Sequence, residues 1–344
     1  MKNLQYNSID TLRTVATISV VFLHVSAHYL PKFGTIPTQF WFVANMIDGS
    51  TRFCVPIFFM LSGTLLLSKD YTLSDFLTKR LSRIIPPFLF WSMSYIIYKL
   101  WVLSNTGEVI DWIYALKFTG NKLLTGSMYH LWFVYTILGL YLFVPIIRKW
   151  IKVASQKEII FFLTIWIVSM LFQYIVFKAY KPPIELRYFS GYLGYMVLGY
   201  FLFNTNHPYL NKRSLAIGLV LIGHLVTVLG TYFLSEKAGH FQNQFYIYLT
   251  INVFLSATGI FLFFKNFSIK NNLILRLIHF ISKHSYGIYL IHILVLIFMS
   301  NMGLNMRLAH PIINIPLSAI ICLILSSITI SLLKKSKIGR IIGG

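Results

Sequence analysis

The chain contains ten apolar runs that are each long enough to cross a lipid bilayer. A transmembrane helix needs about 20 mainly apolar residues, and a helix satisfies all of its own backbone hydrogen bonds in lipid. The second run contains Asp48 and Arg52, so we expect a tilted or broken helix there. The ninth run is short and follows an amphipathic lead-in. The predicted spans are residues 9–30, 41–68, 84–104, 128–147, 158–178, 187–204, 214–235, 244–264, 284–301 and 312–333. The sequence therefore predicts an all-α integral membrane bundle of about ten transmembrane helices.

The distribution of charge agrees with this fold class and predicts its orientation. Only 11% of the 344 residues are charged, whereas a soluble domain has about a quarter. The net charge of +21 does not indicate nucleic-acid binding, because the basic residues lie in short clusters between apolar runs. With the N-terminus inside, 20 basic residues fall on the cytoplasmic side and nine on the opposite side. The positive-inside rule then places both termini in the cytoplasm. We expect one membrane domain over residues 1–344, with no appended soluble domain.

The first span carries two ionisable side chains, Arg13 and His24. An ionisable group inside a span is costly and marks a functional hypothesis. Eleven residues correspond to three helical turns plus about 20°, so both side chains project from one face, about 16 Å apart. Arg13 lies near the cytoplasmic boundary and His24 lies deep in the membrane. The alternative is that Arg13 reaches the headgroups or pairs with Asp10, and that His24 makes an interhelical hydrogen bond.

Other polar residues in the spans allow both a functional and a structural interpretation. Arg52 either contacts substrate or forms an ion pair with Asp48, one turn away. Arg80 and Arg83 share a helix face, and arginine binds phosphate through two nitrogens, but ordinary positive-inside charge also explains such a pair.

Two further stretches complete the list of candidates. His130 and Trp132 lie at the outer mouth of the fourth span, where aromatic-belt anchoring accounts for the tryptophan. Tyr286 and His292 lie in the ninth span, and His292 is either a functional imidazole or a packing hydrogen-bonder. We expect no metal site, because the HxxxH pair that begins at His24 has no carboxylate near it and the two cysteines have no ligand spacing.

The sequence resembles the bacterial membrane acyltransferase-3 family. Its first span has the R-x10-H pattern, and further family motifs follow in order over essentially the whole chain: VPIFFMLSG, the Arg80/Arg83 pair, YHLWFVYTILGLYLFVP, GYMVLGYFL and SYGIYLIH. Within the family, the chain is most similar to the single-domain O-acetyltransferases of the type that modifies enterobacterial common antigen. Many relatives carry an additional extracytoplasmic domain, whereas this chain stops at Gly344.

The resemblance implies a membrane O-acyltransferase of the bacterial cytoplasmic membrane. Such an enzyme moves an acyl group, usually acetyl, from cytoplasmic acetyl-CoA or another acyl-CoA to a hydroxyl of a cell-surface or lipid-linked glycan. His24 matches the proposed catalytic histidine, Arg13 its paired arginine, and Arg80 and Arg83 the pair that grips CoA phosphates. No cofactor is implied, because acyl-CoA is a co-substrate. The expected partners are acyl-CoA, the glycan or lipid-linked sugar acceptor, membrane lipids and, as one option, a separate extracytoplasmic transferase.

Two questions stay open at the level of sequence. His24 can act as a general base on the acceptor hydroxyl or carry the acyl group as an acyl-imidazole. The alternative function is a multi-pass transporter or exporter of a sugar, an amino acid or a lipid-linked glycan, since intramembrane arginine and histidine also mark transport pathways. The absence of an obvious duplicated half argues mildly against a transporter built from inverted repeats.

Overall fold

The computed structural model describes residues 2–174, 191–267, 269–304 and 310–344. Within these ranges the regular structure is entirely helical, as predicted. Short 3-10 turns join some of the helices. The α-helices are α1 (Lys2–Ser26), α2 (Thr38–Thr51), α3 (Cys54–Leu66), α4 (Leu73–Asn105), α5 (Trp112–Thr125), α6 (Trp132–Val153), α7 (Gln156–Leu171), α9 (Leu193–Asn204), α10 (Arg213–Ala238), α11 (Ile251–Lys265), α12 (Asn272–Asn301), α13 (Pro311–Leu333) and α14 (Lys337–Ile342).

Seven segments of the described chain are long and apolar enough to cross a membrane. They are Asn7–Lys32, Thr38–Leu66, Tyr129–Val153, Arg213–Ala238, Gln244–Lys265, Asn272–Asn301 and Pro311–Leu333. The predicted span 84–104 lies inside the long helix α4, whereas 158–178 and 187–204 correspond to the shorter helices α7 and α9. The end of the first of these two spans and the start of the second lie outside the described residues. A count of about ten spans therefore stays a prediction.

The second predicted span is broken, as its internal charges suggested. α2 ends at Thr51, α3 begins at Cys54, and Arg52 lies in the turn between them. The physical cause is Pro56, in the first turn of α3. A proline has no backbone N–H and its ring clashes with the carbonyl four residues earlier, which here belongs to Arg52. The break places a buried ion pair at the joint.

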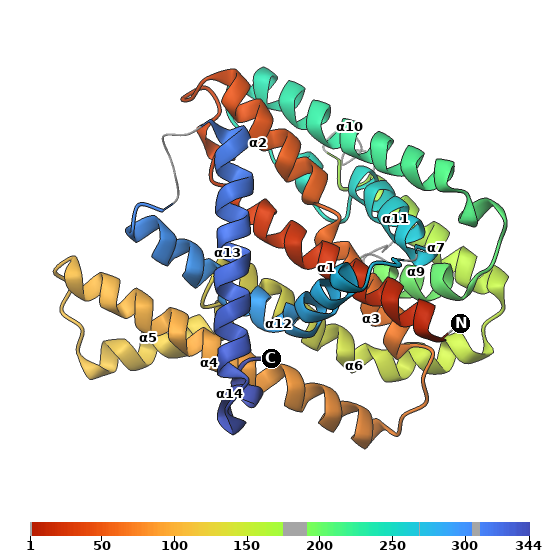
Figure 1. The fold of residues 1–344 in the computed structure, drawn as a ribbon, viewed down its shortest axis with the longest axis horizontal. Coiled ribbons are helices and arrows are strands. Elements are labelled where there is room, and N and C mark those ends of the chain that lie inside the picture. The colour runs from red at the N-terminus through yellow and green to blue at the C-terminus, as the bar shows by residue number, and fades with distance from the viewer. Residues whose placement is uncertain (1, 175–190, 268, 305–309) are drawn as a thin grey trace.

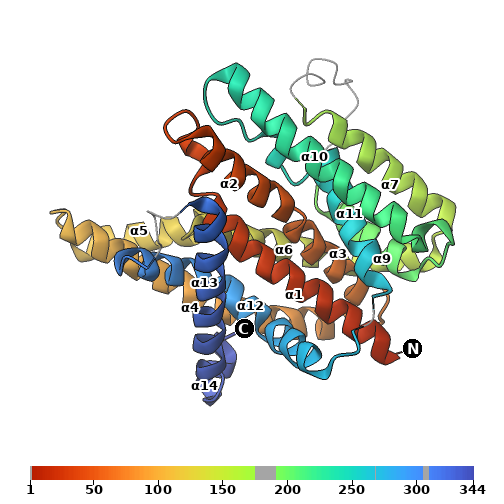
Figure 2. The same ribbon diagram turned by 45° about the horizontal axis from the view of Figure 1, so that its top comes forward.

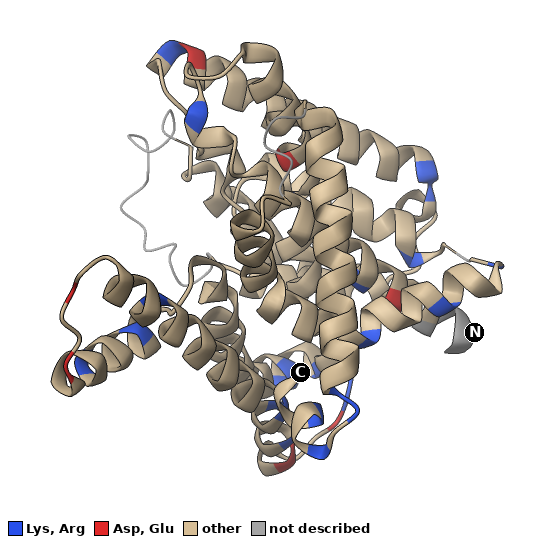
Figure 3. Cartoon of the chain, turned by 60° about the vertical axis from the view of Figure 1, so that its left-hand side comes forward, with Lys and Arg blue, Asp and Glu red and all other residues tan. Residues whose placement is uncertain are grey.

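Helix α1 crosses the middle of the molecule (Figure 1) and is covered on several sides. It contacts α2, α3, α11, α12 and α13. The far part of α4 and the helix α5 project to one side of this body (Figure 2), and α5 has no buried residue. Lys and Arg gather around the C-terminus, near the end of α13 (Figure 3). The residues on α1 are thus placed where several helices converge.

Two glycines allow α3 and α9 to pack with their backbones in contact. A Cβ atom built on Gly199 would lie 2.1 Å from the carbonyl oxygen of Met60, and one on Gly63 would lie 1.8 Å from that of Met196. Small residues permit this close approach of membrane helices. The crossing fixes α3, which lines one side of the second of the two cavities described below, the one that contains Arg13.

Candidate active site

Three histidines from distant parts of the chain meet beside α1. His24 comes from α1, His130 from the 3-10 turn that precedes α6, and His292 from the middle of α12. The ring centroid of His24 lies 5.0 Å from that of His292 and 6.2 Å from that of His130, and the last two are 5.1 Å apart. His130 and His292 are buried, whereas His24 is partly accessible. The structure therefore joins three of the residues that the sequence analysis named separately.

The hydrogen bonding of His292 defines its tautomer. Its Nδ1 lies 2.6 Å from the backbone carbonyl oxygen of Tyr289. A carbonyl only accepts, so Nδ1 carries the hydrogen and the neutral ring keeps a lone pair on Nε2. That Nε2 atom is buried and has no hydrogen-bond partner among the described residues, and the same holds for both ring nitrogens of His130. Because an unpaired buried polar group costs about 1–3 kcal/mol, such atoms are typical of a functional site.

The histidines do not form a metal centre in the part of the chain that the structure describes. No group of three or more His, Cys, Asp or Glu side chains there could hold a metal ion. The chemistry open to the cluster is that of neutral imidazoles, namely proton transfer and nucleophilic attack.

A cavity of about 240 Å³ opens next to His24, and we call it the His24 cavity. It lies toward the C-terminal end of α1. Tyr129 stands edge-on to His24, with a centroid distance of 5.4 Å. The polar groups that line the His24 cavity include Asn314 and Ser318 on α13, and the apolar wall of the cavity comes from α12. A ligand in this cavity would contact His24 directly and find hydroxyl and amide groups around it.

A second cavity, of about 320 Å³, lies nearer the N-terminal end of α1, and we call it the arginine cavity. Its lining includes four of the predicted site residues: Arg13, Arg80, Arg83 and Tyr286. The remaining polar lining residues are Ser62, Tyr141, Ser285 and Tyr289. Three arginines line this cavity, and no aspartate or glutamate does so among the described residues, so the lining favours an anionic ligand.

Contacts with the protein hold two of these arginines in place. Arg13 donates to Ser282 on α12 at 3.1 Å and lies 3.5 Å from a carboxylate oxygen of Asp10. Arg80 lies 3.4 Å from the hydroxyl oxygen of Tyr71. The contact of Arg13 with Asp10 was one of the two alternatives for this residue, and the structure shows that it coexists with a position in the cavity wall.

Tyr289 separates the arginine cavity from the histidines. Its side chain lines that cavity, and its ring lies 5.4 Å from His130 and 5.9 Å from His292. The hydroxyl of Tyr289 donates to the backbone carbonyl of His130. Arg13 and His24 thus line different cavities on the two sides of one layer of aromatic and imidazole rings. Sequence reasoning did not select Tyr289, although its position three residues before His292 placed it on the same helix face.

The acyltransferase domain model that describes the acyltransferase-3 family matches residues 6–334. The chain belongs to the acyltransferase-3 family. Comparison with curated proteins and with solved structures found no match. The family match covers nearly the whole helical bundle, so this is a multi-pass membrane protein of an acyltransferase family, and the transporter alternative is not favoured.

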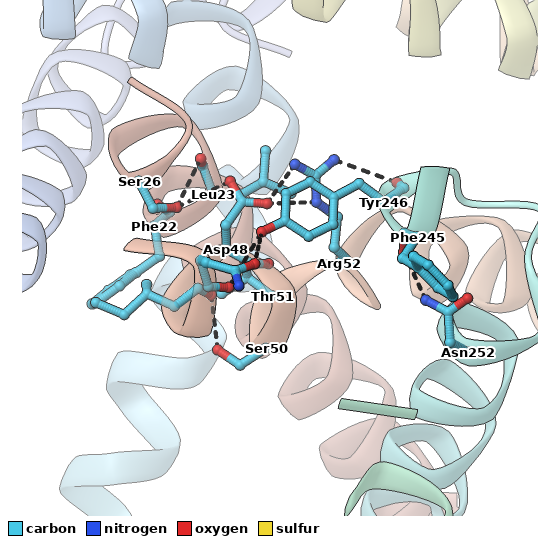
Figure 4. Close-up of polar contacts among 12 residues, drawn as sticks. Phe22, Leu23, Ser26, Asp48, Ser50, Thr51, Arg52, Phe245, Tyr246 and Asn252 are labelled. Carbon is cyan, nitrogen blue, oxygen red and sulfur yellow. Dashed lines mark hydrogen bonds and ion pairs between the residues drawn. The ribbon is translucent and has the colours of Figure 1, made fainter. Parts of the chain in front are cut away.

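Arg52, a further predicted candidate in this acyltransferase, forms a buried ion pair with Asp48 (Figure 4). The Asp48 side chain is 0% exposed and also accepts a hydrogen bond from Ser26, at 3.2 Å. The guanidinium lies over the ring of Tyr246, 4.1 Å from its centroid. Arg52 lines neither of the two cavities. Through Asp48 and Ser26 the ion pair holds the joint between α2 and α3 against α1. The ion pair is one of the two interpretations of Arg52, and a contact with substrate stays a prediction.

Trp132 also lies outside both cavities. Its ring stacks on that of Tyr248, with centroids 5.8 Å apart, and packs against Tyr192 at 5.5 Å. It is therefore part of an aromatic layer that supports α6. The neighbouring residue His130 is the member of this motif that reaches the histidine cluster.

Proposed function

We propose that this acyltransferase-3 protein transfers an acetyl group from cytoplasmic acetyl-CoA to a hydroxyl of a cell-surface or lipid-linked glycan, in the bacterial cytoplasmic membrane. The observation that carries the proposal is the arrangement of two cavities on opposite sides of the histidine layer. One is lined by arginines and the other by neutral hydrogen-bonding groups and His24. A donor and an acceptor can approach such a layer from different ends of α1.

The arginine cavity supports the donor side of the proposal. CoA carries phosphate groups on one end of a flexible arm and the thioester on the other. Arg80 and Arg83 at the cavity wall provide two planar guanidinium groups, which suit phosphate oxygens. Its volume of about 320 Å³ admits the arm, and the tyrosines of its wall lie between the arginines and the histidines. The thioester carbonyl would then stop at the layer that contains Tyr289.

The His24 cavity supports the acceptor side. Sugar hydroxyls are recognised by amide and hydroxyl side chains, and Asn314, Ser318 and Tyr129 offer these groups. Among the described residues, no lysine, arginine, aspartate or glutamate lines this cavity. A neutral, hydroxyl-rich acceptor fits this chemistry, whether it arrives as a lipid-linked sugar or is passed on by a separate extracytoplasmic transferase.

Two mechanisms of acyl transfer can use these groups. In direct transfer, the imidazole of His24 takes the proton of the acceptor hydroxyl while its oxygen attacks the thioester carbon. The C–S bond then breaks, and the CoA thiolate takes the proton from the imidazolium. In two-step transfer, a ring nitrogen of His24 attacks the thioester carbon and the C–S bond breaks. CoA takes the proton that the other ring nitrogen gives up and leaves as a thiol. The acceptor oxygen then attacks the acyl carbon, the C–N bond breaks, and the proton of the hydroxyl returns to the imidazole. In either mechanism the lone pair on Nε2 of His292, whose ring centroid lies 5.0 Å from that of His24, could hold the proton of His24 transiently before CoA takes it.

The test uses membrane vesicles that contain the protein together with native glycans. They are incubated with acetyl-CoA labelled in the acetyl group, and CoA release and glycan label are measured. We expect His24→Ala to lower both by about 10²–10⁴-fold, which is the usual contribution of a positioned acid–base group. The melting temperature of the purified variant should stay unchanged. Full activity of His24→Ala would remove His24 from the reaction. A label on the protein that depends on His24, is trapped by rapid quenching and is released by hydroxylamine would select the two-step mechanism, because an acyl-imidazole is labile to hydroxylamine.

A further inference from the structure

The largest cavity among those described here belongs to neither side of the proposed reaction. It has a volume of about 920 Å³ and lies at the end of α1 that carries the N-terminus, between α1, α12, α13 and α14. We call it the basic groove. It is lined by Asn7, Asp10, Asn272, Leu275, Arg276, Ile278, His279, Phe280, Lys283, His284, Ser331, Lys334, Lys335 and Arg340.

The charge of the basic groove is not compensated by the protein. Five of its lining residues are lysine or arginine, and one, Asp10, is acidic. The carboxylate of Asp10 is already engaged, because it accepts a hydrogen bond from Ser282 at 2.7 Å and lies 3.2 Å from Nδ1 of His279 and 3.5 Å from Arg13. Within the described ranges, none of the five cations pairs with a carboxylate. The groove therefore favours a bound anion.

The cations come from three different elements and converge on one space. Arg276 and Lys283 lie seven residues apart on α12, hence on one face of that helix. Lys334 and Lys335 follow the end of α13, and Arg340 lies on α14. Convergence of this kind differs from a run of charges along a single loop, which is all that the positive-inside rule requires.

An apolar edge borders the cationic surface. Leu273, Ile274 and Leu277, in the first turns of α12, are 66%, 46% and 55% exposed. Ile338 and Ile341 of α14 are 72% and 57% exposed. Exposed aliphatic side chains beside a cluster of cations match a ligand that has both an anionic head and hydrocarbon chains. A water-soluble phosphate would leave this apolar edge uncovered.

We propose that the basic groove is a binding site for an anionic phospholipid, with the headgroup phosphate between α12, α13 and α14 and the acyl chains along Leu273 and Leu277. The site is separate from the arginine cavity, because the two share no lining residue. The pair Asp10 and Arg13 stands between them, with Asp10 in the groove and Arg13 in the cavity. Bound lipid would thus fix the ends of α1 and α12 beside the donor entrance.

The test measures binding of two short-chain lipids to the full-length protein in neutral detergent. The probes are dihexanoyl phosphatidylglycerol, which is anionic, and dihexanoyl phosphatidylcholine, which is zwitterionic. The site variant combines Arg276→Gln, Lys283→Gln, Lys335→Gln and Arg340→Gln. The control variant combines Lys149→Gln, Lys157→Gln, Lys212→Gln and Arg213→Gln, which removes the same charge from residues outside the groove on the predicted same side of the membrane.

We expect the wild type and the control variant to bind the anionic lipid at least tenfold more tightly than the zwitterionic one, and the site variant to lose this preference. An equal loss in both variants would overturn the proposal in favour of general surface charge. Competition by inorganic diphosphate or free CoA at the affinity of the anionic lipid would overturn it in favour of a soluble phosphate. The substituted side chains are exposed, and the pair Arg276→Gln with Lys283→Gln serves as a milder variant that should show an intermediate loss.

Discussion

At the scale of single residues, His292 shows how the helix around a side chain prepares its chemistry. Its Nδ1 hydrogen is used by the carbonyl of Tyr289, one turn earlier on α12. The lone pair is then on Nε2, which has no hydrogen-bond partner among the described residues, and the ring centroid of His24 is 5.0 Å from that of His292. The sequence could name His292 as a buried imidazole, but it could not fix the tautomer, because that depends on a backbone carbonyl of the folded helix.

The substitution His292→Asn separates the two functions of the ring, namely hydrogen-bond donation from Nδ1 and proton acceptance at Nε2. The amide nitrogen of asparagine can replace the Nδ1 donor, whereas nothing replaces the lone pair of Nε2. If His292 receives a proton from the His24 side, kcat for CoA release should fall about 10²-fold while KM for acetyl-CoA stays unchanged. The matched control is His224→Asn on α10, whose side chain lines none of the three cavities discussed here. Wild-type kcat in His292→Asn would leave that residue a packing role only.

The paired arginines permit a similar separation on the donor side. Replacing Arg80 and Arg83 together by alanine removes two cations from the arginine cavity. We expect KM for acetyl-CoA to rise at least tenfold, with a smaller change in kcat, because the phosphates lie far from the reacting carbon. Lys79→Ala is the control, since Lys79 is exposed and lies 4.0 Å from Asp75 outside the cavity. An unchanged KM in the double variant would contradict the assignment of this cavity to CoA.

The positions of Arg13 and His24 show what residue spacing along a helix can and cannot predict. The interval of eleven residues placed Arg13 and His24 on one face of α1, and both do lie in cavity walls. They serve different cavities, because α12 and the ring of Tyr289 lie across the space between them. His130 and His292 are more than 160 residues apart in the chain. Their contact depends on how α6 and α12 pack, which no local pattern encodes.

At the scale of helices, hydrophobic length and breakers predicted most of the elements. The break of the second span was expected from Asp48 and Arg52, and Pro56 supplies its backbone cause. The lead-in to the ninth span belongs to the same helix as the span, so α12 is continuous from Asn272 to Asn301. Sequence reasoning separated them because residues 272–283 form an amphipathic segment, with Arg276, His279 and Lys283 among apolar side chains. In the structure, these three side chains line the basic groove.

The close crossing of α3 and α9 predicts that a larger residue at Gly199 destabilises the protein. Gly199→Ala would place a Cβ atom 2.1 Å from the carbonyl oxygen of Met60, so the two helices must move apart. We expect a loss of about 1–3 kcal/mol of stability, as for other overpacked cores, and a lower melting temperature in detergent. Gly218→Ala on α10 is the control, since its Cβ would meet nothing within 4 Å. Equal melting temperatures for the two variants would show that α3 and α9 do not pack this tightly.

At the scale of the whole molecule, the sequence predicted the class of fold better than the number of spans. Apolar length alone identifies seven described segments, and α7 and α9 are 16 and 12 residues long. Short helices that are shielded by neighbours do not need the full thickness of a bilayer, so a window of about 20 residues cannot count them with certainty. The orientation of the bundle is a separate prediction, which rests on the charge summed over all loops.

This orientation predicts that the reaction is sided. Acetyl-CoA does not cross membranes, and the arginine cavity lies toward the end of α1 that carries the N-terminus. With 20 basic residues on the predicted cytoplasmic side against nine on the other, we expect that end to face the cytoplasm. Sealed inverted vesicles should therefore release CoA from added acetyl-CoA and expose a C-terminal tag to protease. Sealed right-side-out vesicles should neither release CoA nor expose the tag until they are permeabilised. Their activity after permeabilisation is the control for equal protein content. Activity of intact right-side-out vesicles would place the donor cavity on the opposite side and reverse the roles assigned to the two cavities.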